Sequence, residues 1–144
     1  MTTEREPDLG MLIGQLARSL QDELFTRLAE QGHPGVRPRH GTVLAVLPAD
    51  GARATEPARR SGQHKQIVGV IVDELVQLGY VRREHDPSDR RAKLVVPTEA
   101  GLDEISKARA TLARIEQRHR QELGEEAYRG FMGALEHISR SQRA

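Results

Sequence analysis

Apolar side chains recur at steps of three and four residues in the first part of the chain. The members of this stripe are Leu9, Leu12, Ile13, Leu16, Leu20, Leu24 and Leu28. Such spacing puts them on one face of a helix. A Gly-His-Pro-Gly sequence from residue 32 follows, and these residue types end helices. The pattern therefore predicts an amphipathic helix over residues 9–31.

Three shorter helices are predicted in the next part of the chain. Pro38 suits the first position of a helix that runs to residue 47. Thr55 is a candidate N-cap for a short helix over residues 55–60, which keeps Pro57 in the first turn. A break at Ser61-Gly62 precedes the third helix, over residues 64–78.

The helix over residues 64–78 is predicted to have two distinct faces. At 100° per residue, one side consists of Ile67, Ile71, Leu75 and Leu78. The other side consists of Lys65, Gln66, Gly69 and Asp73. A glycine at position 79 follows as a C-cap. The polar side is therefore available to a partner.

A charged segment separates two short runs that are rich in valine. Strands are predicted over residues 80–84 and 93–96, and the intervening residues 85–92 are predicted to form a charged loop. Within this loop, the sequence Asp86-Pro87-Ser88-Asp89 has the composition of a tight turn. Together these segments predict a β-hairpin with a basic tip.

Two further helices complete the chain. Thr98 is a good N-cap for a long helix that reaches Leu123, and Gly124 interrupts it before a last helix that begins at Glu125. The order is four helices, two strands and two helices, so the fold class is mainly α with a small β-hairpin. Short helices followed by a hairpin predict a winged helix-turn-helix in one domain, residues 1–144. The long helices could form a coiled coil, but their apolar stripes are broad, which favours a packed layer.

Composition excludes several classes of protein. Aromatic residues make up only 3% of the 144 residues, which argues against stacking of single-stranded nucleic acid. Cysteine is absent, so disulfides, thiolate zinc sites and thiol redox sensors are excluded. No apolar run approaches the roughly 18 residues that cross a bilayer, and the acidic start MTTEREPD is unlike a signal peptide. We expect a cytoplasmic protein with no membrane partner and no cofactor.

Charge is distributed unevenly along the chain. Residues 53–93 hold nine basic and six acidic side chains, a net charge of +3, whereas the whole chain has a net charge of +1. A local basic surface on a nearly neutral protein indicates that one face contacts a polyanion.

The segment from Val72 to Gly101 resembles the MarR family of bacterial transcriptional regulators. A Leu-rich helix end leads into Gly-aliphatic-Val, an Asp-x-Arg wing, an apolar strand and Thr-x-x-Gly. The matching residues are Leu75, Gly79, Val81, Asp89, Arg91, Val95, Thr98 and Gly101. The resemblance implies a homodimer that binds a pseudo-palindromic operator in double-stranded DNA, most often as a repressor. It also implies a winged-helix part over about 37–97 and dimerisation helices over about 9–31 and 98–142.

The resemblance further implies that a small-molecule effector releases the DNA. Family members often bind effectors between the dimerisation layer and the winged helix. Arg39 and His40 lie near that place in the chain and are the candidate effector-binding residues. The alternative is that both are polar groups at the start of a helix.

The wing is the hairpin predicted over residues 80–96, and four of its residues are expected to contact DNA. Arg91 is predicted to enter the minor groove, where negative potential is concentrated. Asp89 is predicted to brace the guanidinium of Arg91 through a bidentate pair, which reduces the entropic cost of ordering it. Arg90 and Lys93 are expected on phosphates. The alternative is a solvated turn of mutually neutralising charges.

The helix predicted over residues 64–78 is the expected groove helix, and the remaining DNA contacts are expected from it and from the residues just before it. Its first turn is expected to meet base edges through Gln63, His64, Lys65 and Gln66. Gly69 allows close approach of the backbone, and Val70 either touches a thymine methyl group or packs in the core. His64 either reads a base or caps the helix. Before that helix, Arg59 and Arg60 are expected on phosphates, and a solvated helix end is the alternative.

Other functions have weaker support. Glu116 and His119 lie three residues apart on a helix, but no third metal ligand is near them, so no metal site is predicted. No Ser/His/Asp arrangement, phosphate-binding loop or zinc-hydrolase motif is present, so no enzyme is expected. The alternative function is a dimeric small-molecule or metal sensor that acts through a protein partner.

Overall fold

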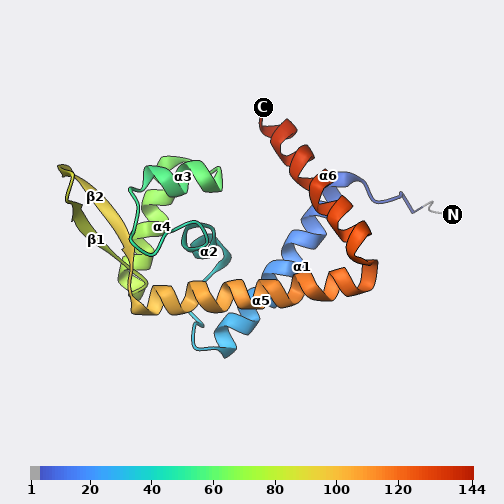
Figure 1. The fold of residues 1–144 in the computed structure, drawn as a ribbon, viewed down its shortest axis with the longest axis horizontal. Coiled ribbons are helices and arrows are strands. Elements are labelled where there is room, and N and C mark those ends of the chain that lie inside the picture. Colours follow the sequence, from blue (N-terminus) through green and yellow to red (C-terminus); the bar gives the residue numbers. More distant parts are fainter. Residues whose placement is uncertain (1–3) are drawn as a thin grey trace. The chain divides into compact units, whose positions relative to one another are not determined.

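The computed structural model describes residues 4–144, so the first three residues of the acidic start lie outside the described part. The chain divides into two compact units, one up to Ala108 and one from Arg109 (Figure 1). The first unit contains helices α1 to α4, a β-hairpin and the first turns of α5. The second contains the rest of α5 and helix α6. The fold class predicted from the sequence, mainly helical with one hairpin, is confirmed.

Helices α1 and α2 begin where the sequence predicts. Helix α1 spans Leu9–Glu30, and its N-cap Asp8 accepts a hydrogen bond of 2.9 Å from the backbone N–H of Met11. Helix α2 spans Pro38–Leu44, which is shorter than the predicted 38–47. Its end tightens because the N–H groups of Val46 and Leu47 bond to carbonyls three residues back rather than four.

Helices α3 and α4 form the helix-turn-helix. Helix α3 spans Thr55–Ser61 and α4 spans Lys65–Leu78. The two helices end at Gly62 and Gly79, which have φ values of 73° and 83°. Glycine adopts this left-handed conformation without steric cost, so it ends each helix sharply.

The buried face of α4 differs from the predicted face. Its core side chains are Val68, Ile71, Val72 and Leu75, whereas Ile67 is 53% exposed and Leu78 is 44% exposed. Ile71 and Leu75 are buried as predicted, but Val68 and Val72 complete the buried face. At 100° per residue this face is rotated by roughly 55° from the predicted one. The hydrophobic core of the first unit consists of Val36, Val43, Leu44, Leu47, Ala58, Val68, Ile71, Val72, Leu75, Tyr80, Val81, Val95 and Ile105.

The hairpin is longer than the sequence predicts. Strand β1 spans Val81–Asp86 and strand β2 spans Asp89–Pro97, and they pair antiparallel with Val81 opposite Pro97. The predicted loop over residues 85–92 is therefore wrong, since most of it lies in the two strands. A backbone bridge also joins Ala52 to Val95 of β2.

The Thr-x-x-Gly sequence joins the hairpin to helix α5, which spans Glu99–Leu123. Thr98 Oγ1 accepts a hydrogen bond of 3.2 Å from Gly101 N–H, which confirms the predicted N-cap, and it donates one of 2.6 Å to the Gly79 carbonyl. A Cβ atom at Gly101 would collide with the backbone carbonyl oxygen of Tyr80. The close approach of α5 to Tyr80 therefore requires glycine at this position.

The second unit contains a helical corner. Gly124, with φ of 87°, separates α5 from helix α6, which spans Glu125–Arg143. The break at Gly124 is thus confirmed. The guanidinium of Arg120 lies over the ring of Tyr128 at 4.9 Å from its centre, a cation–π contact that bridges the corner. Among residues 4–144, no helix is long and apolar enough to cross a membrane.

Candidate nucleic-acid interface

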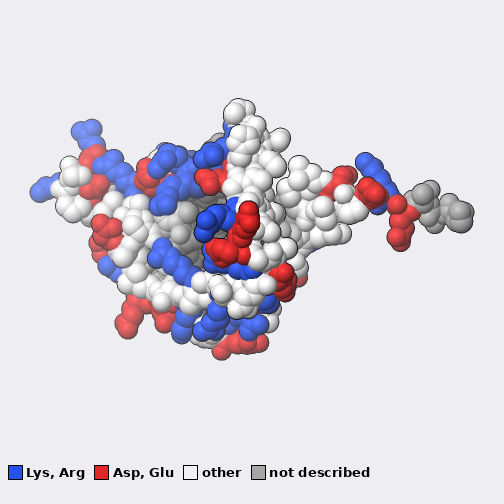
Figure 2. Space-filling model, turned by 45° about the vertical axis from the view of Figure 1, so that its right-hand side comes forward, with Lys and Arg blue, Asp and Glu red and all other residues white. Residues whose placement is uncertain are grey.

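The tip of the wing presents cations to solvent. Arg90, Arg91 and Lys93 are all exposed, and within residues 4–144 their side chains form no hydrogen bond or ion pair. Figure 2 shows basic side chains at this tip, at the left of the view, with acidic side chains among them. The β-ribbon therefore carries charges that are available to a polyanion.

The predicted brace between Asp89 and the Arg91 guanidinium is wrong. Asp89 Oδ1 instead accepts a hydrogen bond of 3.0 Å from the backbone N–H of Arg91. A carboxylate two residues before an N–H readily closes such a turn, and this leaves the guanidinium without a partner. The aspartate orients the backbone of the tip rather than the arginine side chain.

Arg53, which sequence reasoning missed, contacts both turn aspartates. Its Nε and Nη2 atoms lie 3.0 and 2.9 Å from Asp86 Oδ2, and Nη2 lies 3.9 Å from Asp89 Oδ2. The other oxygen of Asp86 accepts hydrogen bonds from the Oγ–H and N–H groups of Ser88, at 2.7 and 2.9 Å. The bonds from Ser88 and then the contact with Arg53 lower the pKa of Asp86 below its usual value. Asp86 is therefore ionised and fully bonded.

The first turn of α4 exposes its polar side chains. Lys65 and Gln66 are exposed, and Gln63 is half-buried, with its Oε1 atom 3.4 Å from Thr42 Oγ1. His64 is the N-cap, since its Nδ1 atom accepts a hydrogen bond of 3.3 Å from Gln66 N–H. The capping alternative for His64 is thus confirmed. Its exposed ring lies at the start of the first turn of α4.

The outward face of α4 continues into Gly69 and Val70. Val70 is 59% exposed, so its alternative assignment to the core is wrong. Nothing lies within 4 Å of the point that a Cβ atom on Gly69 would occupy. A partner can therefore approach the backbone of α4 closely at Gly69.

Helix α3 adds two exposed arginines, Arg59 and Arg60. Arg59 Nη2 donates a hydrogen bond of 2.9 Å to Glu56 Oε2, and this bond lowers the pKa of Glu56. A phosphate would have to compete with this carboxylate for Arg59. Exposed pairs of this kind are weak, so the exchange costs little.

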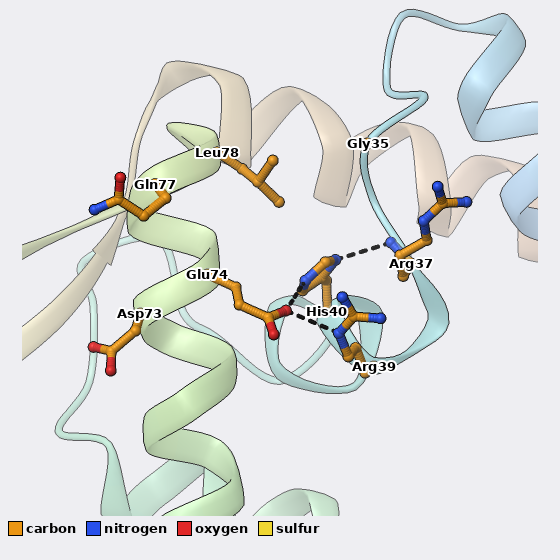
Figure 3. A pocket seen from close by; sticks show the side chains of 8 residues that line it. All are labelled: Gly35, Arg37, Arg39, His40, Asp73, Glu74, Gln77 and Leu78. Atoms are coloured by element: carbon orange, nitrogen blue, oxygen red, sulfur yellow. Dashed lines mark hydrogen bonds and ion pairs between the residues drawn. The ribbon is translucent and has the colours of Figure 1, made fainter.

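The two candidate effector residues line one cavity of about 420 Å³ (Figure 3). His40 is 2% exposed; its Nδ1 atom accepts a hydrogen bond from Arg37 N–H at 2.9 Å, and its Nε2 atom donates to Glu74 Oε2 at 2.6 Å. Arg39 Nε donates to the same oxygen at 2.8 Å. His40 thus serves the start of α2, as its alternative states, and it also ties α2 to the groove helix α4. Bonds from Arg39 and then His40 lower the pKa of Glu74.

A second cavity of about 450 Å³ lies between α1 and the start of α2. Arg37 lines both cavities. Phe25 and Val36 supply apolar surface in the second one, and Asp22 and Glu30 supply carboxylates. The first unit therefore has two hollows beside α2 that are large enough for a small organic molecule.

Glu116 and His119, the pair with the spacing of metal ligands, lie on α5. No group of three potential His or carboxylate ligands is found in residues 4–144. His119 Nδ1 lies 3.5 Å from Glu122 Oε2 rather than against Glu116.

Residues 35–92 match the sequence model of the MarR family. The chain is 40% identical over 52 residues to an uncharacterized HTH-type transcriptional regulator, YcgE, of Bacillus subtilis (strain 168). That alignment covers 36% of this chain and 34% of YcgE, so it concerns a segment of each protein.

Solved structures extend the similarity to almost the whole chain. CouR from Rhodococcus jostii RHA1 bound to p-coumaroyl-CoA is 27% identical, with a TM-score of 0.73 and 91% of each chain covered. The transcriptional repressor CouR bound to a 23-mer DNA duplex is 25% identical, with a TM-score of 0.75 and 92% of each chain covered. The resemblance expected from the sequence is confirmed: residues 35–92 match the MarR-family model, and the chain shares its fold with the similar regulator CouR.

Proposed function

We propose that the chain is a homodimeric repressor that binds a pseudo-palindromic operator in double-stranded DNA through α4 and the wing. The observation that carries this proposal is the set of three exposed, unpartnered cations at the hairpin tip, Arg90, Arg91 and Lys93, among the described residues. MarR-family members are regulators rather than enzymes, and no reaction is proposed.

Helix α4 and the wing contact different parts of the DNA in this proposal. Lys65 and Gln66 in the first turn of α4, and Gln63 just before it, are expected to meet base edges in the major groove, as the same part of other helix-turn-helix proteins does. Glutamine pairs with adenine and lysine with guanine or phosphate, so this turn supplies sequence preference. Arg91 enters the minor groove, and its missing intramolecular partner means that no ion pair must break first. Arg59, Arg60, Arg90 and Lys93 neutralise phosphates.

Two exposed apolar helices support a dimer. On α1, Leu9, Leu12 and Leu16 are each about half exposed. On α6, Phe131 and Met132 are exposed to a similar degree. Contiguous apolar faces of this kind are characteristic of protein interfaces. A second copy would bury them and bring two groove helices to half-sites about one helical turn apart.

The experiment that tests this function is selection of bound duplexes from a random double-stranded pool. The expected result is an inverted repeat whose half-sites lie about 10 base pairs apart, bound by two chains. Recovery of unrelated sequences, or of one half-site bound by a single chain, would contradict the proposal. The salt dependence of binding then counts the phosphate contacts, at a slope of about 0.9 per contact.

An effector that releases DNA is the second part of the proposal. The cavity beside Arg39 and His40 supports it, because Glu74 on the groove helix is bonded to both residues. A ligand that takes Arg39 away from Glu74 would remove one of the ties between α2 and α4. Solved structures of the similar protein CouR are bound to p-coumaroyl-CoA in one case and to a 23-mer DNA duplex in another. A screen of small organic acids for loss of operator binding tests this part, and Arg39→Ala should abolish any response. If no compound changes the affinity, the effector is rejected while DNA binding stands.

A further inference from the structure

The turn of the wing contains two carboxylates that would oppose binding to DNA. Asp86 and Asp89 flank the tip, within three residues of each other, and phosphate groups repel both. The side chain of Asp86 is only 12% exposed, so its charge lies in a partly dehydrated position. A buried or half-buried carboxylate requires a cation or several hydrogen bonds. The wing needs a partner for these acids that does not consume its own arginines.

Arg53 meets this requirement from outside the hairpin. It is bonded to Asp86 across 33 residues of sequence, and it reaches Asp89 with the same guanidinium nitrogen. The residue before it, Ala52, exchanges two backbone hydrogen bonds of 3.0 and 2.8 Å with Val95 in β2. Gly51, with φ of 85°, lies so close to β2 that a Cβ atom would be 2.7 Å from Val96 Cγ2 and 2.8 Å from the Val95 carbonyl oxygen. The base of the Arg53 side chain is therefore fixed to the wing.

We propose that Arg53 is the positioning residue of the wing: it clamps the turn aspartates so that Arg90 and Arg91 reach DNA unpaired. This inference rests on the proposed function, and it adds to that function a residue that touches the turn rather than the DNA. With Arg53 in place, Asp86 holds Ser88 and Asp89 holds the Arg91 backbone. Without it, the two acids lose their shared cation, and Arg90 and Arg91, which directly follow Asp89 in the chain, become available as replacement partners. The clamp thus keeps the minor-groove arginine free.

Charge and position make opposite predictions for Asp86→Asn. If charge alone matters, loss of a negative group beside DNA strengthens binding. If Arg53 positions the turn, the variant weakens binding, because the asparagine keeps an acceptor for Ser88 but loses the ion pair with Arg53. Glu84→Gln is the matched control, since Glu84 is an exposed acid of the same hairpin that pairs with Arg82 instead.

The experiment measures the affinity of the selected duplex by fluorescence anisotropy for the wild type, Arg53→Ala, Asp86→Asn, the double variant and Glu84→Gln. We expect each single change at the clamp to weaken binding about three- to tenfold. The double variant should bind DNA about as well as the single variant with the lower affinity. Glu84→Gln should bind as tightly as the wild type or more tightly. Tight binding by Asp86→Asn, or losses that multiply in the double variant, would overturn the positioning role and indicate that Arg53 contacts phosphate directly.

A second readout needs no DNA. Hydrogen exchange of the Ser88 and Arg91 amides reports the two turn bonds, and Arg53→Ala should accelerate both about threefold or more. Glu84→Gln should leave both rates unchanged. Unchanged exchange in Arg53→Ala overturns the clamp even if DNA affinity falls. A wild-type chain that binds no duplex, with faster exchange in Arg53→Ala, rejects the proposed function and supports the clamp.

Discussion

The wing tip and the junction between α1, β1 and α5 both contain ionisable side chains, which are largely exposed at the tip and largely buried at the junction. At the wing tip, the side chains of Arg90, Arg91 and Lys93 are exposed and form no hydrogen bond or ion pair within residues 4–144, whereas the carboxylates of Asp86 and Asp89 are bonded. At the junction, buried His33 joins Tyr80 and Asp103: its Nδ1 atom lies 2.7 Å from the Tyr80 hydroxyl oxygen, and its Nε2 atom lies 2.7 Å from Asp103 Oδ2. Beside them Glu104 is 1% exposed, and its Oε2 atom has no hydrogen-bond partner in the described part of the chain.

This contrast indicates that the exposed side chains of the wing tip determine DNA affinity, whereas the buried side chains of the junction determine the stability of the fold. An exposed arginine costs the folded state almost nothing, so it is free to serve a partner. A buried carboxyl without a full set of partners lowers stability once it ionises. Changes to the exposed arginines of the wing tip should therefore alter DNA affinity and leave unfolding unchanged, whereas changes at the junction should alter unfolding.

The largest expected effect is on stability, from Gly101→Ala at the junction. The added methyl group would collide with the backbone carbonyl of Tyr80 and lie 3.3 Å from Pro97 Cβ. Neither group can move without disturbing the start of α5, so we expect a loss of about 2–3 kcal/mol in the free energy of unfolding. Urea denaturation measures it. The control is Gly130→Ala in α6, where nothing lies within 4 Å, and no loss is expected there. Equal effects of the two changes would contradict the packing at Gly101.

The next effect is on the pH dependence of stability, from Glu104→Gln. Burial raises the pKa of Glu104 to about 7, above the 4.5 of a free glutamate, so the folded state holds the proton more tightly than the unfolded state. Stability should therefore fall as pH rises from about 4.5 to 7. Glutamine removes this loss, and the variant should be more stable than the wild type by roughly 1–3 kcal/mol at pH 8. Urea denaturation at pH 5 and pH 8 measures it.

Asp103→Asn is the control, because the pKa of Asp103 is shifted in the opposite direction from that of Glu104. Bonds from Lys107 and then His33 lower the pKa of Asp103, so its stabilisation is present above the unfolded pKa and is lost in acid. This variant should be less stable than the wild type at pH 8. If both variants lose stability at pH 8, Glu104 is not the buried, unpaired acid described above.

At the wing, Arg91→Ala should weaken operator binding by about 1–3 kcal/mol and leave the urea midpoint unchanged. Fluorescence anisotropy with the selected duplex measures the affinity. Arg140→Ala in α6, whose guanidinium pairs with Glu136, is the control and should bind normally. A change in stability as large as the change in affinity would remove the contrast between the two regions.

The smallest effect is expected at α3. Arg59→Ala should lower the slope of log affinity against log salt by about 0.9, which corresponds to one phosphate contact. Glu56→Gln removes the carboxylate that competes for Arg59, so it should strengthen binding slightly at the same slope. An unchanged slope in Arg59→Ala would mean that this arginine faces solvent in the complex.

Local patterns in the sequence predicted most of the fold. The spacing of leucines predicted α1, and Thr98 and Gly124 marked the ends of the long helices. The hairpin was predicted too short because Arg90 and Arg91 resemble loop residues. In a two-stranded ribbon the backbone bonds are satisfied whichever side chains face solvent, so charge does not mark the end of a strand.

The contacts at the site were harder to predict because they join distant residues. The Asp89–Arg91 brace was inferred from a spacing of two, yet that spacing suits a bond to the backbone. The guanidinium that contacts the two turn aspartates belongs to Arg53, which is 33 residues from Asp86 in sequence. His33 and Asp103 are likewise 70 residues apart. Periodicity carries no information on such pairs, since they depend on how the elements pack.

The most direct test of the proposed function compares the affinity of the wild type for the selected inverted repeat with that for a scrambled duplex of equal length, at one salt concentration. The account predicts binding of two chains per repeat, at least a thousandfold tighter than to the scrambled duplex, and a clear loss of this preference when the repeat is cut to one half-site. Equal affinity for the two duplexes would contradict sequence-specific recognition by α4 and the wing.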